Sequence, residues 1–115
     1  MIFRKGDIVL VNLEPTMGSE QGKIRPCIII QNDIANEFSP TTIIVPLTSS
    51  IPDKQYPIEP SIEPEESGLR EKSAVLCNQI RTVSIEDRIL KKISSLTPGT
   101  MRKVNDALKL SLALE

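Results

Sequence analysis

Short apolar runs separated by turn residues predict a protein built mainly of β-strands. Five runs are rich in β-branched residues and are bounded by Gly, Pro or polar clusters: 7–13, 25–32, 41–48, 73–83 and 89–93. The second run is apolar on both faces, as in a strand of a closed or covered sheet. Pro46 lies near the end of the third run and predicts an edge or a bulge there. A weaker strand at 55–58 brings the expected number to five or six.

The segments between these runs lack an apolar period and are expected to be loops. Residues 16–24 contain Gly18 and Gly22 and form a loop of about nine residues, which is longer than a tight hairpin requires. Residues 33–40 are expected to be a polar link. Residues 51–71 carry four of the nine prolines, which indicates a surface loop around the weak strand.

The C-terminal part of the chain carries the signals of a helix. Thr97 is a good N-cap, and Pro98 occupies the first helical position. Apolar residues then recur at spacings of three and four: Met101, Val104, Leu108 and Leu112. Leu110 and Leu114 widen this apolar face, so part of it is expected to contact a second subunit or the margin of the sheet.

Together these elements predict a mainly β fold with a C-terminal α-helix, a small SH3-like β-barrel. A length of 115 residues fits a single domain spanning 1–115. A hydrophobic content of 39% excludes a disordered chain. No apolar run approaches the roughly 20 residues needed to cross a bilayer, and Arg4 and Lys5 interrupt the N-terminus with charge. We therefore expect a cytoplasmic protein with no membrane association.

Charge is unevenly distributed, although the formal net charge is only −1. Residues 26–71 hold eight carboxylates and two cations, whereas residues 72–110 hold eight cations and three carboxylates. A local surface that binds anions is therefore compatible with the neutral total.

The chemistry available to the chain is limited by what it lacks. Histidine is absent, which removes the commonest general base and metal ligand. Cys27 and Cys77 lie 50 residues apart in apolar stretches, so a zinc site is not expected. We expect both to be small buried residues on strands, with a structural disulfide as the alternative. Neither a nucleophile elbow, a phosphate-binding P-loop nor a dinucleotide-binding glycine pattern is present.

Three polar clusters lie at the ends of predicted strands, where a scaffold usually presents functional groups. They are Ser19-Glu20-Gln21 with Arg25, Thr48-Ser49-Ser50, and Asn78-Gln79-Ile80-Arg81-Thr82. Each also has an ordinary interpretation: a surface ion pair between Arg25 and Glu20, a strand-terminal turn, and a cross-strand hydrogen-bond network. In the third cluster, alternation along a strand would place Gln79 and Arg81 on one face. Together the clusters suit binding of phosphates and bases through arginine forks and amide edges.

At these residues the sequence resembles the MazF/PemK family of toxin endoribonucleases. The matching segments, in order, are 6–13, Gly18-Ser19-Glu20-Gln21 with Arg25-Pro26, Val45-Pro46-Leu47-Thr48-Ser49, and 76–82. The resemblance implies a homodimeric SH3-like barrel that cleaves single-stranded mRNA at short sequences and halts growth until a cognate MazE-like antitoxin binds. It implies no metal and no cofactor. Expected products are a 2′,3′-cyclic phosphate and a 5′-hydroxyl.

The resemblance also implies roles for individual residues. Arg25 and Thr48 form the catalytic pair near the scissile phosphate, and Glu20 is the nearby carboxylate that orients Arg25 or acts as a base. The expected RNA-binding residues are Ser19, Gln21, Ser49, Asn78, Gln79 and Arg81. In the Kid/PemK branch an arginine and an aspartate occupy the positions of Leu76 and Asn78, so the mechanism of that branch does not transfer.

Two other functions fit a small barrel of this kind. One is a non-enzymatic toxin similar to the gyrase poison CcdB, but this chain has no tryptophan, which the functional C-terminus of that toxin includes. The other is an SH3-like module that binds proline-rich peptides. Such modules present an aromatic groove, and this chain has only three aromatic residues.

Overall fold

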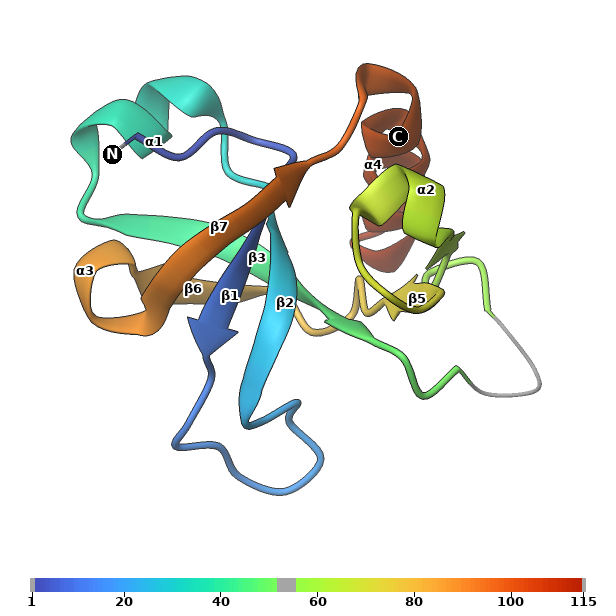
Figure 1. Ribbon diagram of the computed structural model, residues 1–115, viewed down its shortest axis with the longest axis horizontal. Coiled ribbons are helices and arrows are strands. Elements are labelled where there is room, and N and C mark those ends of the chain that lie inside the picture. Colours follow the sequence, from blue (N-terminus) through green and yellow to red (C-terminus); the bar gives the residue numbers. More distant parts are fainter. Residues whose placement is uncertain (1, 52–55, 115) are drawn as a thin grey trace.

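The computed structural model describes residues 2–51 and 56–114. Its elements in chain order are β1 (Asp7–Asn12), β2 (Ile24–Ile29), α1 (Asp33–Phe38), β3 (Thr41–Thr48), β4 (Ser61–Ile62), α2 (Pro64–Ser67), β5 (Ser73–Val75), β6 (Arg81–Ser84), α3 (Ile85–Arg88), β7 (Ile89–Ser95) and α4 (Pro98–Ser111). The strands cross the middle of the molecule, with α1 and α3 at one side and α2 and α4 at the other (Figure 1). The predicted mainly β fold with a C-terminal helix is confirmed.

All strand pairs in the described residues are antiparallel, and their order along the sheet is β4-β5-β3-β2-β1-β7, with β6 also paired to β3. Strand β3 therefore has β2 on one side, and β6 followed by β5 on the other. This arrangement corrects the prediction that Pro46 marks an edge or a bulge, because Pro46 pairs with Cys27 of β2 in an unbroken register. Pro46 lies between Ile44, the last residue paired with β6, and Leu47, the first paired with β5, so its missing N–H removes no ladder bond.

Several predicted boundaries are wrong for local reasons. The predicted strand 73–83 is two strands, β5 and β6, joined by a turn, so residues 78–80 do not alternate between faces. The predicted polar link 33–40 contains α1, whose N-cap Asn32 accepts a hydrogen bond from the backbone of Ala35. The weak strand predicted at 55–58 is absent from its described part, where residues 57 and 58 form a turn. Its first residue, Gln55, lies outside the described residues.

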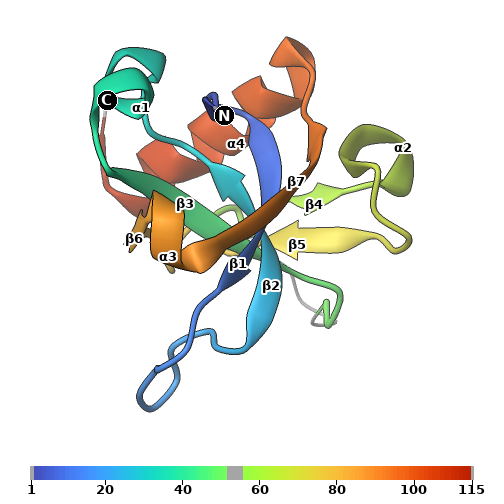
Figure 2. The same ribbon diagram turned by 60° about the vertical axis from the view of Figure 1, so that its left-hand side comes forward.

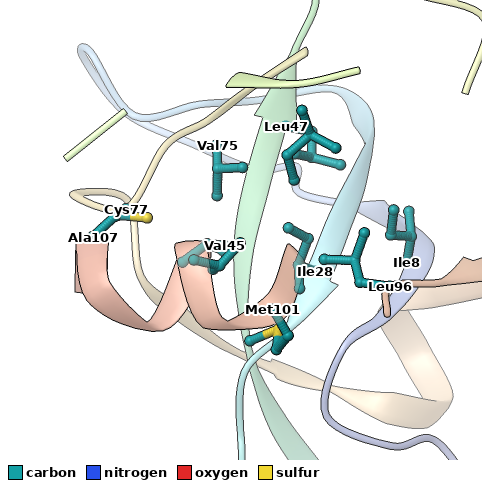
Figure 3. Close-up of a cluster of buried hydrophobic side chains, with 11 residues drawn as sticks. Ile8, Ile28, Val45, Leu47, Val75, Cys77, Leu96, Met101 and Ala107 are labelled. Atoms are coloured by element: carbon teal, nitrogen blue, oxygen red, sulfur yellow. The ribbon is translucent and has the colours of Figure 1, made fainter. Parts of the chain in front are cut away.

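Two clusters of buried side chains lie on opposite faces of the central strands. One contains Ile8, Ile28 and Val45 and packs against α4, whereas the other contains their strand neighbours, including Val9 and Ile29. Figure 3 shows Ile28 of β2 and Val45 of β3 beside helix α4 near Met101, and Cys77 next to Ala107 of α4. Because the central strands are covered on both faces, their sequences are continuously apolar. Each such buried aliphatic side chain is worth about 1.5–3 kcal/mol relative to exposure.

Helix α4 begins as predicted, with the side chain of Thr97 accepting a hydrogen bond from the backbone of Thr100 and Pro98 in the first turn. Met101 and Val104 are buried, whereas Leu110, Leu112 and Leu114 are each more than half exposed. The wide apolar face is therefore only partly covered within one chain. None of the helices in the described residues has the length and apolar content to cross a membrane.

Candidate active site

Strand register places Arg25 and Thr48 on the same face. Strands β2 and β3 pair Ile29 with Ile44, Ile28 with Val45 and Cys27 with Pro46, where the paired stretch ends. Arg25 lies two residues before Cys27 in β2, and Thr48 lies two residues after Pro46 in β3. Because side chains alternate along a strand, the two predicted catalytic residues have their side chains on the same face.

The guanidinium of Arg25 is held from one side by the loop that precedes β2. Its Nε donates to the carbonyl oxygen of Gly22 over 3.3 Å. With the amide of Gln21 oriented to satisfy both groups, the Gln21 oxygen accepts from Nε over 2.9 Å and from Nη2 over 3.1 Å. The N–H groups of Nη1 make no hydrogen bond within residues 2–51 and 56–114, so they are available to a ligand.

The hydroxyl of Thr48 is set up as a donor. Its Oγ1 accepts a hydrogen bond from the backbone N–H of Ser50 over 3.2 Å, in the turn that ends β3. A hydroxyl whose oxygen is already an acceptor still has its own proton to donate. Thr48 is half-buried. Its two neighbours in the sequence, Leu47 and Ser49, line a surface hollow of about 400 Å³.

The loop between β1 and β2 projects from the sheet in both views (Figures 1 and 2) and is tied to the site by Gln79. Oε1 of Gln79 accepts from the backbone N–H of Gln21 over 3.2 Å, and its Nε2 donates to the carbonyl of Ser19 over 3.4 Å. The start of the loop is anchored by Arg81, whose Nη1 donates to the carbonyl of Leu13. Predicted RNA-binding residues from the first and third clusters thus meet.

A close approach inside this loop accounts for Gly22. A Cβ at this position would lie 2.5 Å from Oε1 of Glu14 and 2.7 Å from Oγ1 of Thr16. The same Glu14 oxygen accepts from the backbone N–H of Lys23 over 2.6 Å. The loop therefore closes around a glycine whose own carbonyl oxygen accepts the hydrogen bond from Arg25.

Two hollows adjoin the loop. The larger, of about 400 Å³, is lined by Arg25, Pro26, Leu47, Ser49, Leu69, Arg70, Glu71 and Ser73. The smaller, of about 80 Å³, is lined by Leu13, Glu20, Gln21, Ile44, Pro46, Gln79, Ile80 and Arg81. Gln21 and Arg25, which are hydrogen-bonded, line different hollows and so lie at their boundary.

Sequence reasoning missed Arg70, a second guanidinium in the larger hollow. It is exposed and makes no ion pair within the described residues. One sequence feature could have pointed to Arg70. It is one of only two cations in the acidic segment 26–71, and it lies just before a predicted strand.

Glu20 and Asn78 are placed differently from the other predicted residues. Oε1 of Glu20 accepts from the backbone N–H of Met17 over 2.7 Å, closing a turn in the loop, and Arg25 bonds to Gln21 instead. The ion pair between Arg25 and Glu20, offered as the ordinary interpretation, is not formed. Asn78 lies exposed in the turn after β5, next to Gln79.

Neither cysteine is poised for nucleophilic chemistry. Both are free and buried, as expected, although Cys77 lies in a turn and not on a strand. Burial raises the pKa of Cys27 to about 12 despite the opposing charges of Arg81 and Arg25, and burial also raises the pKa of Cys77 to about 12. Thiols with such pKa values stay protonated near neutral pH and are inert.

Comparison with known families matches residues 4–112 to the PemK-like, MazF-like toxins of type II toxin–antitoxin systems. The chain belongs to this family. It is 42% identical to the endoribonuclease EndoA of Bacillus subtilis over 99% of this chain and 97% of that protein. It is 41% identical to the endoribonuclease MazF of Staphylococcus saprophyticus over 98% and 93% of the two chains. The predicted family and enzyme class, an endoribonuclease toxin, are thereby confirmed.

Solved structures share the MazF fold at lower identity. MazF from Deinococcus radiodurans superposes with a TM-score of 0.84 at 23% identity, covering 99% of each chain. A mycobacterial endoribonuclease in complex with its cognate antitoxin gives 0.79 at 22% identity, covering 98% of this chain and 97% of that one. These likenesses confirm the fold, and the family match leaves no support for the gyrase-poison or SH3-module alternatives.

Proposed function

We propose that this MazF-family toxin cleaves single-stranded mRNA at a specific short sequence, without a metal ion, by using the 2′-hydroxyl of its substrate as the nucleophile. The observation that supports the proposal is the guanidinium of Arg25, which is held from one side by the preceding loop and lines a hollow of about 400 Å³, together with both sequence neighbours of Thr48. A fixed guanidinium and a hydroxyl donor on one face suit a phosphate that gains charge during the reaction.

In the proposed step, the 2′-oxygen attacks the adjacent phosphorus and loses its proton to solvent water, or to the carboxylate of Glu20 if that group acts as a base. The bond from phosphorus to the 5′-oxygen breaks, and that oxygen takes up a proton from water, which leaves a 2′,3′-cyclic phosphate and a 5′-hydroxyl. The guanidinium of Arg25 stabilises the phosphorane through its charge and its Nη1 donors. A guanidinium keeps its protons at neutral pH and is a poor proton donor, so the role of Arg25 is electrostatic. Thr48 donates a hydrogen bond to a phosphate oxygen.

The RNA is proposed to follow both hollows. Ser49 lies in the wall of the larger one, and Ser19 and Asn78 lie on the loop and the turn beside the smaller one. Gln21, Gln79 and Arg81 have partners within the protein and contact RNA through their remaining N–H groups. Specificity for a sequence then follows from hydrogen bonds to the edges of unstacked bases.

The toxin is proposed to act as a cytoplasmic homodimer that a MazE-like antitoxin neutralises. The exposed Leu110, Leu112 and Leu114 at the end of α4 support an association surface. The antitoxin is proposed to cover the loop that carries Glu20 and Gln21, because that loop holds Arg25 in place. Sedimentation that shows a stable monomer at micromolar concentration would contradict the dimer.

The proposal is tested by incubating the protein with a long mixed-sequence RNA in excess EDTA and mapping the ends. We expect cleavage to survive the chelator and to leave cyclic phosphates, and Arg25→Ala and Thr48→Val to reduce kcat by about 10²–10³-fold each. Arg4→Ala, which removes an exposed cation near α1, is the matched control and should cleave normally. Loss of activity in EDTA, or an active Arg25→Ala variant, would refute the mechanism.

The role of Glu20 is tested separately. If its carboxylate acts as a base, Glu20→Gln should lower kcat strongly with the fold intact. If it only closes the turn at Met17, an amide oxygen still accepts that hydrogen bond and kcat should remain near normal.

A further inference from the structure

A continuous set of hydrogen bonds leads from the turn after β5, through the loop between β1 and β2, to Arg25. Gln79 holds the loop at two backbone positions, the N–H of Gln21 over 3.2 Å and the carbonyl of Ser19 over 3.4 Å. Gln21 in turn accepts two hydrogen bonds from Arg25, over 2.9 and 3.1 Å. The position of one side chain thus determines the position of the next.

The chemistry of Gln21 suits this arrangement. An arginine carries large rotamer entropy, so a guanidinium acts reliably only when it is fixed from one side. A carboxylate would fix it more strongly, but it would cancel much of the charge that the phosphate requires. A neutral amide oxygen fixes the plane of the guanidinium and leaves its charge and its Nη1 donors for the substrate.

We propose that Gln21 and Gln79 are positioning residues for Arg25: Gln21 orients the guanidinium, and Gln79 holds Gln21 in place. This inference rests on the proposed catalytic role of Arg25. It gives Gln21 and Gln79 a role in the rate of the chemical step that is additional to any contact with RNA. A displacement of about 1 Å in a reacting group can cost about 10²-fold in rate, so loss of either glutamine should be visible in kcat.

The first test is Gln21→Met, which keeps the length of the side chain and removes the amide oxygen. We expect kcat to fall about 10–100-fold, in addition to any change in KM or in the cleaved sequences that loss of the Gln21 amide N–H groups causes. In an Arg25→Lys background the same change should cost less than about twofold, because the fork it supports is already absent. Gln31→Met is the matched control, since Gln31 bonds to Asn36 near α1, and it should leave kcat per folded molecule unchanged.

The second test changes Gln79, the residue that holds Gln21 in place. Gln79→Met should lower kcat in the natural background and have little further effect when combined with Gln21→Met, because both act through the same guanidinium. A spectroscopic signature accompanies these rates. The Nε–H of Arg25 should give a slowly exchanging proton signal in nitrogen-edited spectra of the protein. Gln21→Met should speed this exchange, because only the longer bond to the carbonyl of Gly22 remains, while backbone signals stay in place.

The outcomes separate this inference from the function on which it rests. An active Arg25→Ala variant would remove the catalytic role of Arg25 itself. If Arg25→Ala is inactive but Gln21→Met keeps kcat within about twofold, only the positioning role is overturned. A rise in KM with altered cleavage sites and an unchanged kcat would also overturn it, and would leave Gln21 as an RNA contact alone.

Discussion

The buried side chain of Asn36 in α1 allows a sharp test of how this fold is stabilised away from the site. Asn36 is only 5% exposed, and its Oδ1 accepts from Nε2 of Gln31 over 2.9 Å and from Oγ1 of Thr42 over 2.7 Å. Its Nδ2 donates to the backbone carbonyl of Gln31 over 2.9 Å. Asn36→Ala removes three hydrogen bonds and leaves the fully buried hydroxyl of Thr42 without its acceptor.

The size of the effect follows from the number of bonds lost. At a net worth of about 0.5–1.5 kcal/mol for each hydrogen bond, Asn36→Ala should lower the free energy of unfolding by about 3 kcal/mol. Thr42→Val removes one of the three bonds and should cost about 1 kcal/mol. The double variant should cost about 1 kcal/mol less than the sum of the two, because valine no longer leaves a hydroxyl unsatisfied.

Urea unfolding at one fixed protein concentration measures these values, since association would otherwise shift the midpoint. Glu37→Ala, an exposed change on the same helix, should stay within about 0.5 kcal/mol of the natural protein. RNA cleavage per folded molecule should be unchanged in every variant. A cost below about 1 kcal/mol for Asn36→Ala, or strict additivity with Thr42→Val, would refute the reasoning.

Three further predictions concern other parts of the molecule. Hydrogen bonds from the backbone of Glu63 and the hydroxyl of Thr100 lower the pKa of Glu66. Its contribution to stability is therefore present above its ordinary pKa near 4.5 and is lost as pH falls through the lower folded value, so acid unfolding of Glu66→Gln should show a weaker pH dependence in this range. Arg70→Ala should raise KM and reduce the salt slope of RNA binding by about 0.7, and an unchanged slope would exclude a phosphate contact. Gly22→Ala should lower kcat while urea unfolding changes little, because the new methyl displaces the loop that holds Arg25; normal turnover would contradict this.

Much of the fold is accessible to sequence reasoning because local signals and burial agree. Thr97 and Pro98 predict the start of α4 correctly. The apolar runs of β1 and β3 are continuous because a cluster of buried side chains covers each face of these strands. Helix α1 was missed for the opposite reason. Ile34 and Phe38 are 76% and 79% exposed, so the helix has no buried apolar stripe, and only the cap at Asn32 marks it.

The site shows where sequence reasoning stops. Gln21 and Gln79 from two predicted segments are hydrogen-bonded, and Arg25 and Ser49 line one hollow, but the residue types do not determine which side chains bond to each other. Opposite charge makes Glu20 a possible partner of Arg25, as in the ordinary interpretation of this cluster, whereas the loop conformation presents Gln21 to Arg25. That Arg25 and Thr48 share a face depends on a register that only the paired strands reveal. Arg70 enters the site through a turn after α2 that carries no recognisable motif.

The change of partners along β3 has a consequence for how the toxin loses activity. Up to Ile44 the strand pairs with β6, and from Leu47 it pairs with β5, so Thr48 is held by β5, whereas Arg25 of β2 pairs with Val11 of β1. The two residues of the proposed catalytic pair are thus held in place by different neighbouring strands. A local opening that detaches β4 and β5 would inactivate the enzyme while most of the sheet stays folded. Amides of β5 that exchange with solvent faster than those of β1 would reveal this reversible, subglobal inactivation.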